Sequence, residues 1–344
     1  MRDIRIALDM MGGDYGPRTT IPAAIKAVDR FPNLHLYLCG HSQSIHTLLN
    51  KHNALAHPRL TVVHTEQIVN QDERPDLALR RKDKSSMRKA LELVEEEKAD
   101  ACVSAGNTGA LLAMARYVLK TLPGIKRPAL ISSLPTYENE KVFLLDLGAN
   151  IHQCPDTLFQ FSVMGSVMAE EVEGIELPRV ALLNVGEEEI KGSDHLKRTA
   201  EMLSASKHIN YVGFAEGNDI FSGKADVIVC DGFVGNVALK TIEGVAKLII
   251  SKLKAISEKS FFSKIMIGLL IPGIKKLFSK MNPDQYNGAS LVGLRGIVVK
   301  SHGNASARAF YSAIKEAVKE SQRQVPHKIK DRVEQVLKAE DKEV

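Results

Sequence analysis

Tryptophan is absent from the 344-residue chain, and aromatic residues make up only 5% of it. A surface that stacks nucleobases or sugar rings on aromatic side chains is therefore not expected. Charge of one sign is also scarce, because 46 basic and 41 acidic residues leave a net charge of only +5. This charge is too small to indicate nucleic-acid binding, so no nucleic-acid partner is predicted.

Long hydrophobic runs are missing as well. The longest nearly unbroken apolar stretch, residues 265–274, is about half as long as a membrane-spanning helix and is interrupted by Gly268, Pro272 and Gly273. Residues 1–6 lead directly into a strand-like run without the apolar core of a signal peptide. The sequence therefore predicts a cytoplasmic protein without a membrane span.

Cysteine is rare, and its spacing excludes a zinc site or a disulfide framework. Cys39, Cys102, Cys154 and Cys230 lie more than fifty residues apart in the sequence. Three of them fall in apolar, strand-like runs, so we expect small buried core residues. We predict no metal ligands.

Short apolar runs do recur, at intervals that leave room for a helix between them. They are residues 4–9, 34–39, 60–64, 101–104, 142–146, 180–184, 209–213, 227–230 and 297–300. Amphipathic stretches such as 87–97 and 110–120 lie between them, which is the pattern of parallel strands with helices on both faces. No linker divides the chain, so we predict a single α/β catalytic domain over residues 1–344.

Nearly every apolar run ends in a cluster of small or polar residues. The clusters are 9–14, 104–109, 146–150, 184–187, 231–236 and 301–304. The carboxyl ends of parallel strands line the ligand crevice of an open sheet, and helix N-termini bind anions there. We expect the clusters to converge on one site, although glycine and asparagine at any one of them can serve only as turn residues.

Residues 247–281 differ in character, since eight lysines and one acidic residue, Glu258, give them a net charge of +7. Apolar residues at helical spacing predict an inserted, basic, amphipathic helical pair. Its apolar face packs either on the core or a second subunit, or on a membrane surface. Further along, Asn304 is expected to cap a helix to about Gln322. Residues 325–344 are predicted to form a charged C-terminal helix without an assigned function.

Several catalytic motifs are absent: the P-loop, the G-x-G-x-x-G dinucleotide fingerprint, the G-x-S-x-G elbow, and a histidine followed five positions later by aspartate. What remains is a surplus of anion-binding turns without an activated nucleophile. A bound phosphate needs no such nucleophile, because it attacks once it is oriented beside an electrophile. The pattern therefore suggests acyl transfer to phosphate. Asn107 and Asn236 are candidate oxyanion donors, and His302 is a candidate proton donor.

Nine segments carry a close resemblance to a known family: residues 8–14, 84–87, 104–110, 145–150, 183–188, 231–233, 236, 239–241 and 286–289. They resemble the bacterial acyl-acyl-carrier-protein:phosphate acyltransferases of phospholipid synthesis, in the expected order from about Ile4 to Gln322. The resemblance implies a Rossmann-like three-layer αβα sandwich, similar to the phosphotransacetylase and isopropylmalate dehydrogenase group. It also implies an enzyme without metal or organic cofactor.

The same resemblance implies the reaction and the partners. Long-chain acyl-acyl-carrier protein and inorganic phosphate would be converted reversibly into acyl phosphate and free carrier protein. A membrane glycerol-3-phosphate acyltransferase would consume the product. A homodimer associated peripherally with the membrane, through residues 247–281, is expected.

Site residues are carried over position by position. Lys191, Asn236 and His302 are the expected catalytic residues. The expected phosphate- or substrate-binding residues are Asp9, Gly12, Gly13, Lys84, Ser104, Gly106, Asn107, Thr108, Asp146, Asn184, Asp231, Gly232 and Lys300. Three departures from the family pattern limit what is carried over. Val234 stands where many relatives have threonine, so a hydroxyl there is not essential. Residues 151–152 stand where Val-Asp is expected, so no acidic role is carried over at that point. Residues 15–16 differ from a common His-Ala and are given no catalytic weight.

Two other functions are compatible with the sequence. A phosphotransacetylase that uses acyl-coenzyme A shares the chemistry but prefers a soluble, short-chain donor. A peripheral membrane scaffold rests on residues 247–281 alone and needs neither Lys191 nor Asn236.

Overall fold

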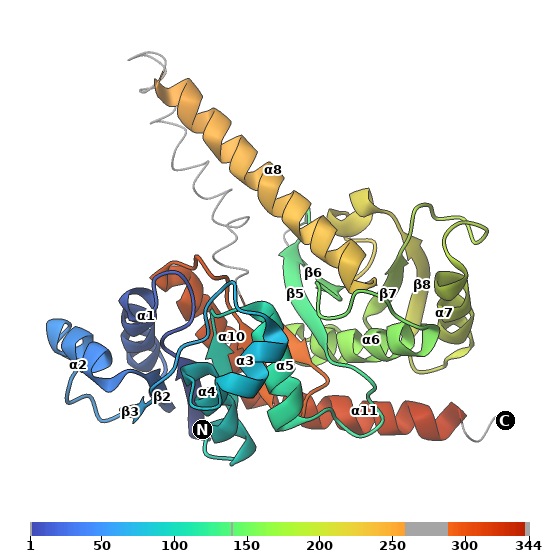
Figure 1. Cartoon of the computed structure of the whole chain (residues 1–344). Helices are drawn as coiled ribbons and strands as arrows, with labels where there is room; N and C mark the ends of the chain where they lie inside the picture. The colour runs from blue at the N-terminus through green and yellow to red at the C-terminus, as the bar shows by residue number, and fades with distance from the viewer. Residues whose placement is uncertain (1, 139, 259–287, 341–344) are drawn as a thin grey trace.

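The computed structural model describes residues 2–138, 140–258 and 288–340, and Figure 1 shows their arrangement. The described residues form one sheet in the order β3-β2-β1-β4-β11-β10-β5-β6-β9-β7-β8. The strands are β1 (Ile4–Asp9), β2 (Leu34–Gly40), β3 (Leu60–His64), β4 (Ala101–Ser104), β5 (Ala129–Pro135), β6 (Lys141–Leu145), β7 (Arg179–Leu183), β8 (Asn210–Ala215), β9 (Val227–Val229), β10 (Ala289–Val292) and β11 (Ile297–Lys300).

Helices cover both faces of this sheet, which confirms the predicted three-layer α/β sandwich. They are α1 (Pro17–Arg30), α2 (Ser42–Lys51), α3 (Pro75–Arg81), α4 (Ser86–Glu95), α5 (Thr108–Leu119), α6 (Pro155–Met168), α7 (Asp194–Ala205), α8 (Gly232–Glu258), α10 (Ala307–Arg323) and α11 (Val325–Glu340). A π-helical turn (Ala169–Glu173) and a 3-10 turn (Gly217–Phe221) complete the described elements.

The sheet is mixed, and this corrects the expectation of parallel strands alone. The neighbours β11–β10, β10–β5 and β5–β6 pair antiparallel, whereas the pairs on either side of them are parallel. Three reversals make β6, β9, β7 and β8 run opposite to β1, β2, β3, β4 and β11. The nine predicted strands are present with ends shifted by at most two residues, and β5 and β10 are the two that sequence analysis missed.

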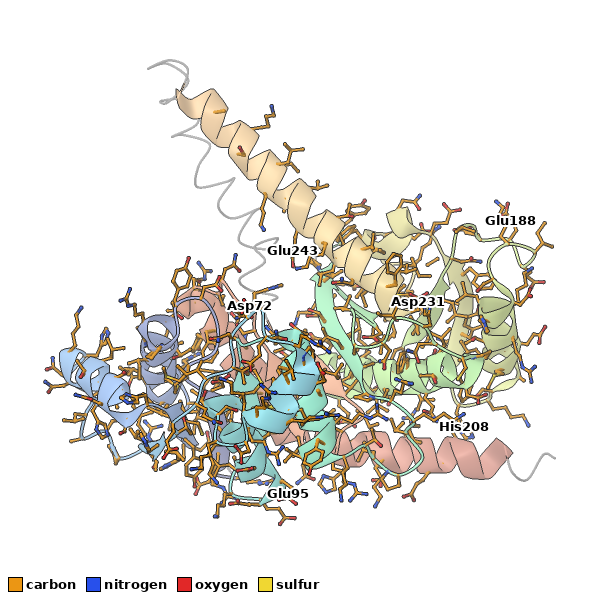
Figure 2. The ribbon with its side chains drawn as sticks, in the orientation of Figure 1. Asp72, Glu95, Glu188, His208, Asp231 and Glu243 are labelled. Carbon is orange, nitrogen blue, oxygen red and sulfur yellow. The ribbon has the colours of Figure 1, made fainter. Side chains whose placement is uncertain are left out.

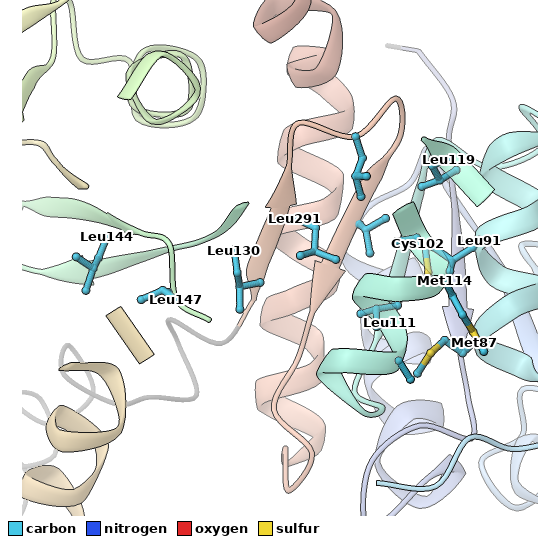
Figure 3. Close-up of a cluster of buried hydrophobic side chains, with 14 of the residues drawn as sticks. Met87, Leu91, Cys102, Leu111, Met114, Leu119, Leu130, Leu144, Leu147 and Leu291 are labelled. Carbon is cyan, nitrogen blue, oxygen red and sulfur yellow. The ribbon is translucent and has the colours of Figure 1, made fainter. Parts of the chain in front are cut away.

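Strand side chains pack against helices on both faces, as expected for buried strands. Ile6 and Leu8 of β1 pack in a cluster with residues of α1 and α10, while Ala7 between them packs with residues of α4 and α5. The second of these clusters continues through both halves of the sheet, and Figure 3 shows it from Met87 to Leu144. A continuous hydrophobic core therefore connects the two halves of the sheet. The single domain over residues 1–344 stays a prediction.

Side-chain caps fix several helix starts. Ser85 and Asn107 accept hydrogen bonds from Arg88 N (3.3 Å) and Ala110 N (3.0 Å) at the starts of α4 and α5. The predicted cap of α10 at Asn304 is wrong, because Ser306 accepts from Ala309 N at 3.1 Å instead. The predicted C-terminal helix corresponds to α11, which packs along α6.

The expected inserted helical pair also needs a correction. Residues 247–258 continue α8, which begins at Gly232, so the basic stretch is not separate from the helix that follows β9. Residues 259–281 lie outside the described residues. Figure 1 shows α8 projecting away from the sheet. None of the described helices combines the length and the apolar character that crossing a membrane requires.

The cysteine prediction is confirmed for the three in strand-like runs. Cys39, Cys102 and Cys230 are buried free thiols, whereas Cys154, just before α6, is exposed.

Candidate functional site

The turns after β1, β4 and β11 form a first cluster (residues 9–14, 104–109 and 301–304) organised by Asp9. The buried carboxylate of Asp9 accepts hydrogen bonds from the hydroxyls of Ser86 (2.6 Å) and Ser104 (2.7 Å) and from Gly12 N (3.1 Å). Burial raises the pKa of Asp9, and these hydrogen bonds oppose that shift. Asp9 therefore holds the turns in place through hydrogen bonds inside the protein, and these bonds occupy its carboxylate oxygens.

Glycines allow these turns to touch one another. A Cβ atom at Gly12 would lie 2.6 Å from Asp9 Oδ2 and 2.7 Å from Gly106 N. Gly13 has φ +85°, and a Cβ there would lie 2.8 Å from the carbonyl oxygen of Gly303. Gly12, Gly13 and Gly106, which the sequence analysis selects as binding residues, therefore lie together in the first cluster.

Asn107 has a structural role that its sequence motif did not reveal. Its amide oxygen caps α5, and its amide nitrogen donates to the carbonyl oxygens of Gln71 (2.7 Å) and Glu73 (3.0 Å). The side chain is therefore occupied, which argues against the expected contact with phosphate. Thr108 is exposed as the first residue of α5, where backbone N–H groups favour an anion.

Lys300 and His302 supply positive charge and a titratable ring beside the first cluster. Lys300 is buried, and its amine donates to the carbonyl of Ser301. Burial lowers the pKa of Lys300 to about 8, with Asp9 acting in the opposite direction. Burial also lowers the pKa of His302, opposed by Glu243 and assisted by nearby lysines. At neutral pH His302 is therefore neutral and Lys300 is charged.

One edge of α8 faces His302. Asn236, Lys240, Glu243 and Lys247 follow each other at spacings of four, three and four, which places them along one line of the helix. The Oε1 atom of Glu243 lies 3.4 Å from His302 Nε2, and its Oε2 atom lies 3.1 Å from Lys240 Nζ. This edge brings Asn236 and Lys240 toward the side of the first cluster, on a helix that starts in the second.

The turn after β6 and the start of α8 form a second cluster (residues 146–150 and 231–236). Buried Asp146 accepts hydrogen bonds from the backbone of Leu130, Ala149 and Asn150, the last at 2.7 Å, and burial raises its pKa. Asp231 accepts from Val234 N (2.9 Å) at the start of α8. The carboxylate of Asp146, like that of Asp9, is therefore occupied by hydrogen bonds inside the protein.

Close backbone contacts hold α8 on this second cluster. A Cβ at Gly232 would overlap the carbonyl oxygen of Asn150, and one at Gly235 would overlap that of Asp146. A Cβ at Gly148 would lie 3.3 Å from Cβ of Asn236. The predicted site residues Asp146, Asp231, Gly232 and Asn236 are thus brought together.

The loop after β7 forms a third, more exposed cluster (residues 184–192). Asn184 accepts from Val185 N (2.9 Å) and donates to the carbonyl of Lys191 (3.2 Å), so it shapes the loop. Lys191 pairs with Glu188 at 2.8 Å, and its side chain is 45% exposed. Lys84 is also exposed and pairs with Glu66 at 3.3 Å. Neither lysine pairs with a residue of the first or second cluster.

The six expected clusters therefore form three groups, with α8 bridging the first two. About 16 Å of helix separates Gly232 from Glu243. Figure 2 shows Glu243 and Asp231 on the side of the molecule from which α8 projects. Asp72, which lies in the loop that Asn107 holds, is on that side too. Sequence analysis did not select Ser86 or Glu243 as site residues. Only Ser86 could have been found from the sequence, because it lies in the same short motif as Lys84.

Solved structures define the class of fold. The chain is similar to a phosphotransacetylase from Streptococcus pyogenes, with a TM-score of 0.61 and 17% identity over 93% of this chain and 94% of that one. It is also similar to a branched-chain phosphotransacylase from Enterococcus faecalis V583, with a TM-score of 0.56 and 15% identity over 92% and 99% of the two chains. The fold is therefore that of the phosphotransacetylases, as the resemblance implied.

Sequence relatives define the family. Residues 4–328 match the family described as "Fatty acid synthesis protein", and the chain belongs to that family. A phosphate acyltransferase from Colwellia psychrerythraea is 62% identical over 96% of this chain and 97% of its own length. One from Pseudoalteromonas atlantica is 56% identical over 98% and 99%. The predicted family is confirmed.

Proposed function

We propose that the chain is a phosphate acyltransferase that moves a long-chain acyl group from acyl-carrier protein to inorganic phosphate. The relatives named phosphate acyltransferase, which match nearly the whole chain, support the reaction class. The observation that carries the proposed site is the meeting of Gly12, Gly13 and Gly106 beside buried Lys300 and neutral His302. Glycine turns with a neighbouring ammonium group suit a phosphate anion.

In this proposal phosphate is held at the first cluster by backbone N–H groups and by the charge of Lys300 and Lys240. Neutral His302 accepts a proton from the bound phosphate. A phosphate oxygen attacks the thioester carbonyl carbon, and Asn236 donates to the developing oxyanion. The C–S bond then breaks, the thiolate leaves with the electron pair and takes up one proton, and acyl phosphate remains. Lys300, with a pKa of about 8, is a more suitable donor of that proton than His302.

Lys191 is proposed to reach the reacting groups by giving up its pair with Glu188. Both side chains are about half exposed, so breaking the pair costs little. Replacing Lys191 and Asn236 by Ala, singly and together, is expected to lower kcat by about 10²–10³ for each lost donor. Acyl phosphate, trapped as its hydroxamate, is the quantity to measure. Full activity in the double variant with an unchanged unfolding transition would refute the assigned roles and favour a scaffold.

The donor is the point on which the main alternative differs. We expect purified protein with phosphate and long-chain acyl-carrier protein to form acyl phosphate without added metal. Equal kcat/KM with acyl-coenzyme A would favour the soluble phosphotransacetylase reaction instead. The same assay tests the reaction class. If acyl phosphate forms with neither donor, the proposed function is contradicted.

The pair between Glu243 and His302 predicts a shift in the pH profile. Glu243 raises the pKa of His302, so Glu243→Gln lowers it, and the neutral ring persists to lower pH. We expect the acid limb of kcat/KM to move to lower pH in this variant. Lys247, which also faces His302 but lowers its pKa, provides the control: Lys247→Gln should move the limb the other way.

The proposal extends to the protein's surroundings. The enzyme is a cytoplasmic homodimer that meets the membrane through residues 247–281 and passes acyl phosphate to a membrane glycerol-3-phosphate acyltransferase. The lysine-rich composition of this stretch supports contact with anionic lipid. Contact with lipid or a second subunit is supported by exposed apolar residues on the described part of α8, among them Val245, Leu248 and Ile249.

A further inference from the structure

A second concentration of positive charge lies in residues 74–89, well before the basic stretch already described. Seven basic and two acidic residues give this segment a net charge of +5. At the end of α3 and in the loop after it, Arg80, Arg81 and Lys84 are exposed to solvent. Together these three residues form a basic tip.

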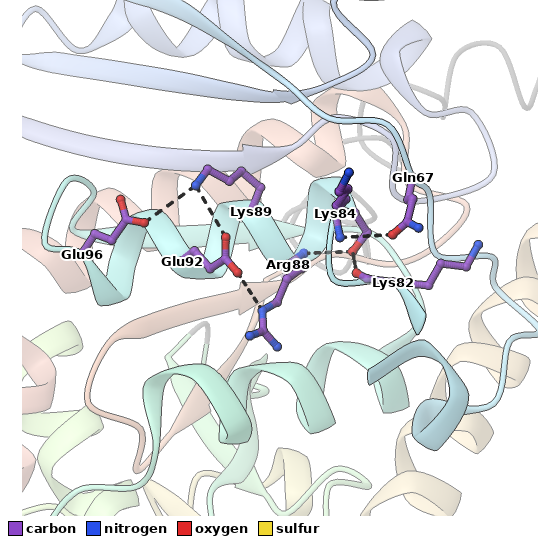
Figure 4. A network of polar contacts seen from close by, with 8 residues as sticks. Gln67, Lys82, Lys84, Arg88, Lys89, Glu92 and Glu96 are labelled. Atoms are coloured by element: carbon purple, nitrogen blue, oxygen red, sulfur yellow. Dashed lines mark hydrogen bonds and ion pairs between the residues drawn. The ribbon is translucent and has the colours of Figure 1, made fainter. Parts of the chain in front are cut away.

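The basic tip differs from the rest of the segment in how its charges are paired. Figure 4 shows Arg88 and Lys89 held by Glu92, at 3.0 and 3.5 Å, with Glu96 also beside Lys89. Arg80 and Arg81 form no ion pair within the described residues. Lys84 has one exposed pair with Glu66, of the kind that adds little stability. The tip therefore presents guanidinium groups that are free to bind carboxylates.

Both ends of this segment are fastened to the first cluster. Before α3, Asn107 Nδ2 donates to the carbonyls of Gln71 and Glu73, and a Cβ at Gly109 would lie 2.7 Å from Pro75. After it, Ser86 Oγ donates to Asp9 at 2.6 Å. Since α3 has seven residues, its end lies only about 10 Å from its start at Pro75. A partner bound at the tip would sit beside the candidate phosphate site.

We infer that the basic tip docks the acidic protein that carries the acyl donor. This inference rests on the proposed function. Arginine forks bind carboxylates in pairs, and opposite charges steer and orient an approaching partner. Membrane binding needs apolar residues beside the basic ones, and residues 80–84 contain none. The charge and composition of the tip thus favour an acidic protein surface over a lipid surface.

The double variant Arg80→Glu/Arg81→Glu tests the inference. We expect the KM for acyl-carrier protein to rise about tenfold or more, with kcat and the KM for phosphate unchanged. Added salt should raise the wild-type KM more steeply than that of the variant. The matched control is Lys197→Glu/Arg198→Glu, another adjacent basic pair on α7, which Figure 1 places at the far end of the second half of the sheet. The control should behave as wild type.

An unchanged KM for acyl-carrier protein in the tip variant would overturn the inference. So would loss of binding to anionic phosphatidylglycerol vesicles with an unchanged KM, because the tip would then contact lipid. Fluorescence anisotropy with labelled holo-carrier protein tests docking without catalysis. If wild-type protein binds the carrier but forms no acyl phosphate, the proposed function fails while docking stands, so the two are separable.

Discussion

Replacing Gly235 by Ala should displace the start of α8 from the second cluster and strongly reduce acyl phosphate formation. An added Cβ would overlap the carbonyl oxygen of Asp146 and lie 2.9 Å from Cys230 Sγ. Backbone oxygen does not give way as a flexible side chain does, so the helix itself must shift. Overpacking of this kind typically costs about 1–3 kcal/mol. Urea denaturation should therefore report lower stability, and activity should fall because Asn236 and Glu243 move with the helix.

Gly244, nine residues further along α8, provides a matched control. A Cβ there would meet nothing within 4 Å, and alanine is the better helix former by roughly 1 kcal/mol. Gly244→Ala should leave activity unchanged and preserve or raise stability. If both variants retain full activity, the position of α8 on the second cluster does not matter for catalysis. If both lose it, α8 responds to any added methyl group and the close contact at Gly235 has no special role.

The sequence predicts the strands of this fold well where apolar runs stand between turn residues. It misses β5 and β10 for physical reasons. Ser132 and Ser133 interrupt the apolar pattern of β5, and β10 has only four residues after Gly288. Both are antiparallel connections, so missing them also hides the reversal of the second half of the sheet. Local patterning reveals a strand, whereas its direction depends on partners far away in the sequence.

The site residues show the same limit. Turn composition selects Asp9 and Asp146 as binding residues, but in the fold their carboxylates accept internal hydrogen bonds, one of them from Ser86, 77 residues away from Asp9. Asn107 likewise has both ends of its amide occupied. Glu243 carries no sequence signal, because its partner His302 becomes a neighbour only when α8 crosses to the end of β11. Residue type indicates anion chemistry, and only the fold decides which groups remain free for it.

Replacing Lys300 by Met is the second change from which we expect a large effect. Lys300 is the one buried lysine among the described residues, and it lies beside the glycine turns of the first cluster. Loss of a charge-assisted interaction of about 1.5–3 kcal/mol should raise the KM for phosphate roughly 10- to 100-fold. Because the pKa of Lys300 is about 8, wild-type kcat/KM for phosphate should also fall as the pH rises through that value.

Stability should move in the opposite direction over the same pH range. The pKa of Lys300 is lower in the folded protein than the ordinary 10.5, so between about pH 8 and 10.5 only the unfolded chain holds this proton. The free energy of unfolding therefore rises with pH there, by about 3 kcal/mol relative to Lys300→Met. Urea titrations at pH 7.5 and 10 measure this difference.

Lys300→Arg, which stays charged, should keep phosphate binding above pH 8. If the stability of wild type and of Lys300→Met depends on pH in the same way, the pKa of Lys300 is not lowered by burial in the folded protein. That result would also contradict the assignment of the Lys300 charge to phosphate binding.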